Sequence, residues 1–501
     1  MQEISELAFR IMEVMSFLFL IAIGLGVLWI VYAYIIDKFQ KRSTLRRNFP
    51  VLARFRYTFE SLGEFLRQYF FAQDREEMPF NRAERSWCYR AAKNVDSTVA
   101  FGSTKDLRHA GTVYFVNSTF PPLEEDFRDP DPILIGPHCR KPYGAASFFN
   151  ISGMSYGAIS LPAIRALSRG AKEAGIWLNT GEGGLSPYHL ESGCDLVFQI
   201  GTAKFGVRNS DGGFDEDKLR DVAGYEQVRM FEIKLSQGAK PGKGGILPGV
   251  KVTPEIARIR GIEPGLDAIS PNRHPEINTV DDLLDVIHYV REITGKPVGF
   301  KTVVGHMDFF DQLCTRIHER GIEGAPDFIT IDSADGGSGA APMSLIDNVG
   351  IPIKESLPQV VDVLEKYKLR ERIRLCASGK LVTPAEVAWA LCAGADFVNS
   401  ARGFMFALGC IQSLQCNKNT CPTGITTHDR NLQYGLHPEE KSVRVAHYAR
   451  NICKEVGVIA HSCGVADPHL LTRKHARIVT EDGRSLGMDK FYSSSARTGP
   501  E

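Results

Sequence analysis

Three cysteines that lie close together in the sequence could hold a metal. Cys410, Cys416 and Cys421 have the spacing C-x5-C-x4-C, and a proline follows the third. A disulfide, a zinc site, an iron–sulfur cluster and burial as free thiols would all use such residues. Zinc usually takes four nitrogen or sulfur ligands, and the other candidates nearby are only Asn417, Asn419, Thr420 and the more distant His428. Iron–sulfur ligation uses irregularly spaced thiolates, sometimes followed by proline, so the spacing leaves this use and plain burial open.

The N-terminal segment indicates which compartment these cysteines occupy. No residue from Val14 to Ile36 is charged, and a helix of this length can cross the roughly 30 Å apolar core of a bilayer. Aromatic residues gather towards one end and basic residues follow at once, as at a cytoplasmic surface: Trp29, Tyr32 and Tyr34, then Lys38, Lys41, Arg42, Arg46 and Arg47. The charged residues that precede this uncharged run are Glu3, Glu6 and Glu13 against a single Arg10, which fits a cleaved signal peptide with a basic start poorly. We therefore expect an uncleaved single-pass anchor over residues 14–36 in the inner (cytoplasmic) membrane, with the remaining chain cytoplasmic.

Composition supports an ordinary globular body behind this anchor. The 59 basic residues are balanced by 59 acidic ones, which argues against nucleic acid as a partner. Structural disulfides are rare in the cytoplasm, and the eleven cysteines are therefore predicted to be thiols or metal ligands. Cys453 and Cys463 have no readable spacing and are assigned to burial.

Residues 37–145 are predicted to form a basic juxtamembrane and helical extension. Within it, residues 50–72 are apolar, aromatic and basic at helical spacing. This helix would either lie on the membrane surface or pack on the main domain, and the pattern favours neither.

From residue 148 onward, short β-like runs alternate with helical patterns, which predicts a parallel sheet of βα units. The runs are FFNISG, IWLNTG, LVFQIG, FEIKLS, LDAIS, PVGFKTV, FITIDSA, IRLCASG and DFVNSA. Eight strands make a (β/α)8 barrel, and we expect LVFQIGTAKFGVRNSDGG to be a hairpin excursion rather than a barrel strand. A doubly wound sheet is the alternative, but no G-x-G-x-x-G follows a strand. The barrel is assigned to residues 146–430, and residues 431–501 to a C-terminal helical extension and tail. Roughly the last fifteen residues are polar and small and are expected to be disordered.

The predicted strands end in glycine-rich or polar clusters, where the chemistry of this fold takes place. The last three clusters resemble a phosphate cup, because glycines let backbone N–H groups approach an anion and an arginine adds a charged fork. The cup residues are Gly336, Gly337, Gly339, Gly379 and Arg402, and the strand-end clusters add Met154, Ser155, Ser378 and Ala401 as further candidates for cofactor contacts.

Lys301, in PVGFKTV, is predicted to point into the barrel mouth. A cation there can stabilise the negative charge that a reduced flavin gathers near N1 and O2. Pairing with Asp332 or Asp335 is the alternative, and the phosphate cup favours the flavin role. A flavin close to the three cysteines in turn favours the iron–sulfur interpretation.

The motifs SGMSYGAIS, NTGEGG, KLSQGAKPGKGG, ISPNRH, DGGSGAAP, ASGKLVTPAE and GCIQSLQCNKNTCPTGITT stand in this order along residues 80–465. The series resembles the FMN-binding domain of glutamate synthases and of their smaller single-chain relatives. The resemblance implies an FMN-bearing (β/α)8 barrel and a 3Fe-4S cluster held by Cys410, Cys416 and Cys421.

The same resemblance implies that the barrel reduces an imine formed from 2-oxoglutarate and ammonia. Glu182 in TGEGG and Lys240 in QGAKPG match positions that handle substrate beside the flavin, and Arg260 matches an arginine that binds the oxoacid. Such side chains suit the task, because cations bind carboxylates and a carboxylate can hold an ammonium or pass a proton. By its helix position alone, Arg260 would be a surface arginine.

Departures from the family pattern put the substrate in doubt. The larger enzymes carry a glutamine where this chain has Ile246. The isoleucine removes a polar contact that helps to hold 2-oxoglutarate. We expect His274, with Arg273, to face the mouth and to replace this contact or act as an acid; a satisfied loop histidine is the alternative. No glutaminase domain or nicotinamide-binding segment is recognised, so we expect electrons to pass to or from a partner protein.

These features predict a membrane-anchored oxidoreductase that acts on a C–N bond of an amino acid, amine or 2-oxo acid, with glutamate synthesis as one possible case. An electron-relay subunit and a non-redox FMN isomerase are the alternatives.

Overall fold

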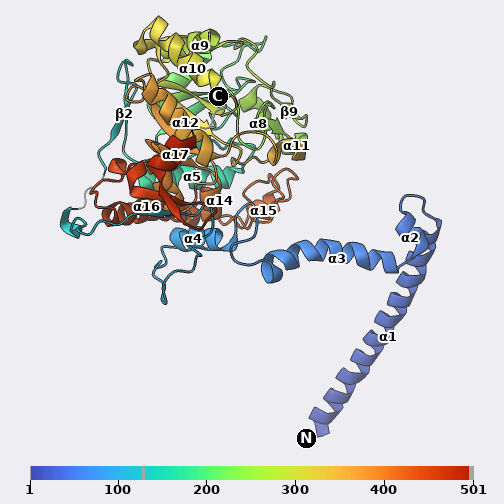
Figure 1. Ribbon diagram of the computed structural model, residues 1–501. Helices are drawn as coiled ribbons and strands as arrows, with labels where there is room; N and C mark the ends of the chain where they lie inside the picture. The colour runs from blue at the N-terminus through green and yellow to red at the C-terminus, as the bar shows by residue number, and fades with distance from the viewer. Residues whose placement is uncertain (1, 127–129, 496–501) are drawn as a thin grey trace. The chain divides into compact units, whose positions relative to one another are not determined.

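The computed structural model describes residues 2–126 and 130–495, and the chain divides into two compact units, Met1–Ala83 and Glu84–Glu501. Three helices make up most of the first unit: α1 (Gln2–Phe39), α2 (Thr44–Asn48) and α3 (Leu52–Leu66), followed by the π-helical turn η1 (Arg67–Phe71). The stretch Ser5–Phe39 of α1 (Figure 1) is long and apolar enough to cross a membrane. Its most apolar 18-residue window has a mean hydropathy of 2.7, and no residue of that window is buried.

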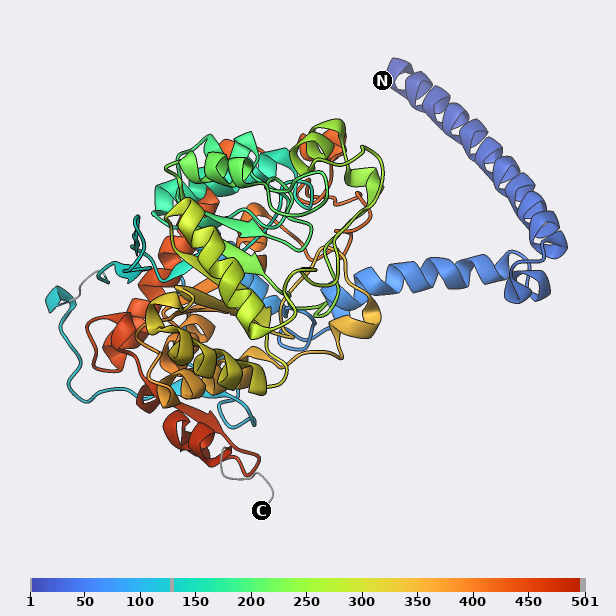
Figure 2. The ribbon, with the colours of Figure 1, turned by 90° about the horizontal axis from the view of Figure 1, so that it is seen from above.

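The second unit contains the predicted barrel. Eight parallel strands close in the order β10-β11-β12-β13-β4-β5-β6-β7, with helices around them (Figure 2). The strands are β4 (Phe149–Ile151), β5 (Leu178–Asn179), β6 (Leu196–Ile200), β7 (Val228–Lys234), β10 (Val298–Val303), β11 (Phe328–Asp332), β12 (Arg374–Ser378) and β13 (Phe397–Ser400). The expected eight-stranded fold is confirmed.

The assignment of LVFQIG to a hairpin excursion is wrong. This run is β6, a barrel strand whose five residues are all buried. The turn-rich tip comes after the strand and forms a single antiparallel bridge between Arg208 and Phe214. The run outside the barrel is LDAIS, where β9 (Ala268–Ile269) pairs antiparallel with β8 (Ile246–Leu247). A barrel strand is covered on both faces, whereas Ile269 is 65% exposed.

Helices and small sheets surround the barrel. The helix α16 (Pro438–Ser462) packs against α5 (Leu161–Ala174), α13 (Pro384–Ala393) and α14 (Arg402–Leu408). The other helices are α4 (Arg82–Ala92), α6 (Pro187–Leu190), α7 (Glu216–Gly224), α8 (Pro254–Arg260), α9 (Val280–Thr294), α10 (Asp308–Arg320), α11 (Met343–Ile346), α12 (Ile353–Lys366), α15 (Arg430–Gln433) and α17 (Met488–Ser495). Short 3-10 turns are η2 (Glu124–Asp126), η3 (Gly249–Lys251), η4 (Ile322–Gly324), η5 (Pro468–Leu470) and η6 (Arg473–His475). A three-stranded sheet joins β1 (Val113–Phe115), β14 (Ala476–Val479) and β15 (Ser485–Gly487).

An apolar floor closes the N-terminal end of the barrel. The hairpin of β2 (Ile133–Ile135) and β3 (Tyr143–Ala145) inserts side chains beneath the strands. They pack with inward-facing residues from the early parts of the strands in one buried cluster: Ile135, Tyr143, Ala145, Trp177, Val197, Met230, Phe328, Cys376 and Phe397. Because apolar side chains fill this end, the polar chemistry is confined to the opposite end.

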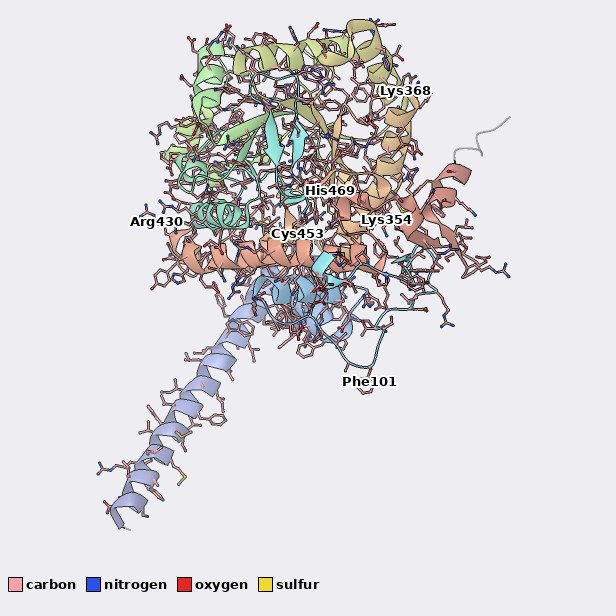
Figure 3. All side chains as sticks on the ribbon, turned by 90° about the vertical axis from the view of Figure 1, so that its left-hand side faces the viewer. Phe101, Lys354, Lys368, Arg430, Cys453 and His469 are labelled. Atoms are coloured by element: carbon pink, nitrogen blue, oxygen red, sulfur yellow. The ribbon has the colours of Figure 1, made fainter. Side chains whose placement is uncertain are left out.

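Two expectations about the C-terminal part are corrected. Residues 488–495 form α17, so the expected disorder is wrong for them, and residues 496–501 lie outside the described part. Cys463 is buried, but Cys453 on α16 is only half-buried, with its Sγ 3.7 Å from the hydroxyl of Ser147 (Figure 3). No disulfide joins any of the eleven cysteines, all of which lie in described residues.

Candidate active site

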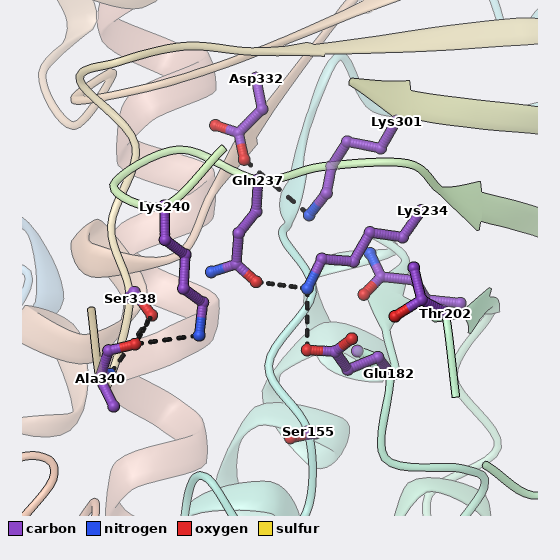
Figure 4. A network of polar contacts seen from close by, with 12 residues as sticks. Ser155, Glu182, Thr202, Lys234, Gln237, Lys240, Lys301, Asp332, Ser338 and Ala340 are labelled. Carbon is purple, nitrogen blue, oxygen red and sulfur yellow. Dashed lines mark hydrogen bonds and ion pairs between the residues drawn. The ribbon is translucent and has the colours of Figure 1, made fainter. Parts of the chain in front are cut away.

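A buried polar cluster lies at the C-terminal ends of the barrel strands. Lys234 ends β7, Lys301 lies on the adjacent β10 in register with it, and Asp332 ends β11. The Nζ of Lys234 is 2.9 Å from Oε1 of Glu182 and also donates to Gln237, while the Nζ of Lys301 is 4.0 Å from Oδ2 of Asp332 (Figure 4). The strand register therefore brings two predicted residues, Glu182 and Lys301, to one mouth.

Glu182 is held in place by two glycines. It lies in the loop after β5, and its carboxylate fits between the backbones of Gly201 and Gly245. A Cβ on Gly201 would lie 2.6 Å from Oε2 of Glu182, and a Cβ on Gly245 would overlap Oε1. The glycines after β6 and in the GKGG motif are thus needed for the position of this carboxylate.

The mouth combines the carboxylates of Glu182 and Asp332 with a larger number of cations. Burial alone would raise the pKa of Glu182, but the charges of Lys234, Lys240 and Arg260 outweigh it and lower the pKa overall. Burial lowers the pKa of Lys240 to about 8, and the positive charge of Lys234 acts in the same direction. The excess of positive charge favours an anionic ligand.

Arg260 is a buried site residue and not the surface arginine that its helix position suggests. It is the last residue of α8, and Gly261 ends that helix in the left-handed conformation. Its Nη2 donates to Ser155 Oγ at 3.3 Å and to the carbonyl of Tyr156 at 3.2 Å, and the guanidinium lies over the ring of Phe205. Within the described residues its buried Nε has no hydrogen-bond partner, which leaves a donor for a ligand.

The residues of the expected phosphate cup are brought together by neighbouring strands. Loops after β11, β12 and β13 supply them, and these strands are adjacent in the barrel. A Cβ on Gly379 would overlap Oγ of Ser333, and one on Gly337 would lie 2.9 Å from Nε of Arg402. Arg402 donates to the carbonyl of Asp335, and Gly339 has open space around it.

The other residues expected to contact the cofactor lie at the same strand ends. Met154 and Ser155 follow β4 and are buried, Ser378 ends β12, and Ala401 follows β13. These four residues therefore lie at the strand ends where the sequence placed them, and their contact with a cofactor stays a prediction.

His274 is placed behind the mouth. It is 1% exposed, and its Nε2 hydrogen-bonds to the carbonyl of Lys234 at 3.1 Å. Its Nδ1 lies 3.7 Å from Oε1 of Glu276, which also pairs with Lys204. In this position His274 holds the backbone at the end of β7 through the carbonyl of Lys234. Its predicted role in catalysis stays a prediction.

The three cysteines share one loop after α14. Burial raises the pKa of Cys410 to about 12, and the other two thiols influence it electrostatically. Lys251 lies beside this loop and donates to the carbonyls of Ala158 and Cys416 at 2.5 and 3.4 Å. Among the described residues, no three His, Cys, Asp or Glu side chains are arranged closely enough to hold a metal ion. The donor chemistry suits an iron–sulfur cluster, but the ligating arrangement stays a prediction.

Comparison with known proteins assigns the chain to a family. The family described as the conserved region in glutamate synthase matches residues 113–466. The chain belongs to this family. The glutamate synthase large subunit-like protein YerD of Bacillus subtilis (strain 168) is 38% identical over 508 residues, which cover 94% of this chain and 96% of that protein. The archaeal-type glutamate synthase (NADPH) of Thermotoga maritima is 36% identical over 316 residues, 63% of this chain and 59% of that protein. Among solved structures, the recombinant flavin-binding domain of baker's yeast flavocytochrome b2 aligns with a TM-score of 0.45 and 15% identity over 83% of this chain and 88% of that one.

Sequence reasoning about this glutamate synthase relative missed Lys234 and the layer beneath it. Below Lys234, the carboxylate of Glu232 accepts hydrogen bonds from Asn179, Gln199 and Thr330 at 2.9, 2.6 and 2.6 Å. A signal was present in the run FEIKLS, because two charged residues at alternate positions of a buried strand must both point inward.

Proposed function

We propose that this protein is a membrane-anchored, FMN-dependent oxidoreductase that acts on a C–N bond of an amino acid, an amine or a 2-oxo acid. The observation that carries this proposal is the group formed at the barrel mouth by the largely buried Glu182 and the buried Lys234, Lys240 and Arg260. Family membership supports the assignment to glutamate synthase-like chemistry.

The residues at the mouth fit FMN. Glycines at 336, 337 and 379 stand where side chains would collide with the neighbouring loops, and Arg402 adds a guanidinium suited to a phosphate. Lys301 supplies a buried cation near Asp332 at the same end of the barrel. When bound, FMN supplies or accepts a hydride at its N5 atom.

The protein side chains would bind and orient the substrate. Lys240 and Arg260 provide cationic donors for a carboxylate, and Nε of Arg260 is free of protein partners within the described residues. Glu182, ionised beside Lys234, can hold an ammonium group or take a proton from it. Ile246 in place of glutamine favours a substrate with less polar character near β8.

A partner protein would exchange electrons with this site. Cys410, Cys416 and Cys421 are the candidate ligands of a 3Fe-4S cluster, and α1 is the candidate membrane anchor, with the barrel on the cytoplasmic side. The exposed apolar surface of α1 and the basic residues that follow this helix support its role as an anchor.

Anaerobic purification in detergent tests the core of this proposal. We expect a flavin spectrum with about one FMN and about three irons per chain. Screening amino acids for bleaching of the flavin would then identify the substrate. A protein that never carries flavin would overturn the proposal.

A further inference from the structure

The first unit has an exposed apolar surface that the proposed enzyme function does not use. On α3, Leu52, Phe55, Phe59 and Leu62 are 68%, 53%, 64% and 42% exposed, and Leu66 continues the same row. At about 100° per residue these five residues, here called the apolar stripe, span an arc of about 80°. The following turn η1 adds exposed Tyr69, Phe70 and Phe71. An apolar stripe of this length needs a partner surface.

The start of α3 is fixed to the end of α1. Nε and Nη2 of Arg54 donate to the carboxylate of Asp37 at 2.7 and 2.9 Å, and the backbone N–H of Val51 donates to the same carboxylate at 3.1 Å. Asp37 is fully buried, as is Ala33 one turn before it. The contact between α1 and α3 therefore lies at Asp37, where the uncharged part of α1 ends.

The opposite face of α3 defines which way the stripe points. The hydroxyl of Tyr57 is 3.3 Å from that of Ser43, and the guanidinium of Arg46 lies 5.0 Å from the centre of the Tyr57 ring. Ser43 and Arg46 belong to the segment that follows α1. Tyr57 lies about 180° around the helix from the centre of the stripe. The stripe therefore faces away from α2 and towards the side on which the body of α1 runs (Figure 1).

We infer that α3 and η1 lie flat on the surface of the phospholipid bilayer that α1 crosses, with the apolar stripe buried among the headgroups and upper acyl chains. The inference rests on the proposed membrane anchor. The direction of the stripe, its continuity with α1 and the arginines at 54, 56 and 67 beside it all suit a lipid surface. The Asp37–Arg54 pair sets the corner between the crossing helix and the surface helix.

The test uses the full-length protein reconstituted in phosphatidylcholine vesicles with some phosphatidylglycerol. The variants Phe59→Trp and Ser61→Trp place a fluorescent reporter on the stripe and on the opposite side of one helical turn, against the same background of native tryptophans. We expect lipids brominated near the headgroup to quench the added emission at 59 at least about twofold more than at 61, and aqueous acrylamide to show the reverse order. Leu62→Trp provides a second reporter on the stripe.

Alkaline carbonate extraction tests the anchoring by α1 separately from the position of α3 on the membrane surface. Protein released by carbonate would show that α1 is no anchor. Protein that stays in the vesicles while position 59 is quenched only by acrylamide would overturn the surface helix and leave the anchor standing. Position 59 shielded from both quenchers would mean that another protein surface, such as a second copy, covers the stripe, and would also overturn the inference.

Discussion

Glu182 and Lys234 form a largely buried ion pair, with 2.9 Å between Oε1 and Nζ, although the two residues come from the loop after β5 and the end of β7. A lone buried carboxylate would cost several kcal/mol of desolvation. The pair keeps Glu182 ionised at the barrel mouth, where an amine substrate would need an acceptor.

Replacing Glu182 by glutamine keeps the shape and removes the charge. We expect the flavin to remain bound and kcat to fall by about 10²- to 10⁴-fold, the usual contribution of a positioned acid or base. Flavin content and steady-state kinetics check this, with exposed Glu263→Gln as the control. Unchanged kcat in the Glu182 variant would show that this carboxylate does not handle the substrate.

The substitution Gly245→Ala tests the position of the same carboxylate without changing its charge. The new Cβ would overlap Oε1 of Glu182, so the carboxylate must move. We expect a loss of at least about tenfold in kcat/KM, corresponding to about 1.4 kcal/mol. Gly305→Ala, which meets no atom within 4 Å, should leave kcat/KM and Tm unchanged. Equal behaviour of the two variants would contradict the fit described here.

Lys240 should give the enzyme a pH dependence on its alkaline side. Burial lowers its pKa from 10.5 to about 8, so its positive charge is lost as the pH rises through about 8. We expect KM for an anionic substrate to rise above this pH, and the variant Lys240→Met to lack that rise. A KM profile that is the same in both proteins would exclude Lys240 from binding.

The same group has an opposite effect on stability. Between about pH 8 and 10.5 the unfolded chain still binds the proton of Lys240 and the folded chain does not. Stability rises with pH wherever the unfolded state binds more protons. The wild type should therefore gain unfolding free energy relative to Lys240→Met across this window, as measured by urea denaturation at several pH values.

Arg402 is predicted to hold a phosphate of FMN. A hydrogen bond to a charged group contributes about 1.5–3 kcal/mol, so Arg402→Ala should weaken the Kd for FMN by at least about tenfold. Reconstitution of flavin-free protein with FMN measures this, and exposed Arg430→Ala serves as the control. Equal affinity in both variants would remove Arg402 from the cup.

Cys416 and Cys453 provide a matched pair for the iron–sulfur prediction. Both are half-buried, but only Cys416 lies in the three-cysteine loop. Cys416→Ser should lose iron and the low-temperature paramagnetic signal of the oxidised cluster, whereas Cys453→Ser should keep both. Retention of full iron content in Cys416→Ser would assign the loop to packing alone.

The sequence predicted the barrel and the grouping of its strand-end loops, because alternating patterns and glycine clusters are local features. It misplaced β6, since a short buried run followed by turn residues is the same pattern as a hairpin arm, and only the neighbours β5 and β7 distinguish the two. Arg260 was named only through the family resemblance, because a helix terminus shows its direction only when the chain closes into a barrel. Lys234 was overlooked, although the alternation in FEIKLS was a signal for it.

The hairpin of β2 and β3 seals one end of the barrel with apolar side chains, while Glu182, Lys234 and the loops around them occupy the other. The stability of the fold and the chemistry of the site therefore depend on different parts of the same strands. Substitutions far apart and without shared partners have nearly additive effects. Substitutions that repack the apolar floor and raise Tm should therefore not change the effect of substitutions at the mouth. The two ends of this barrel can be engineered separately.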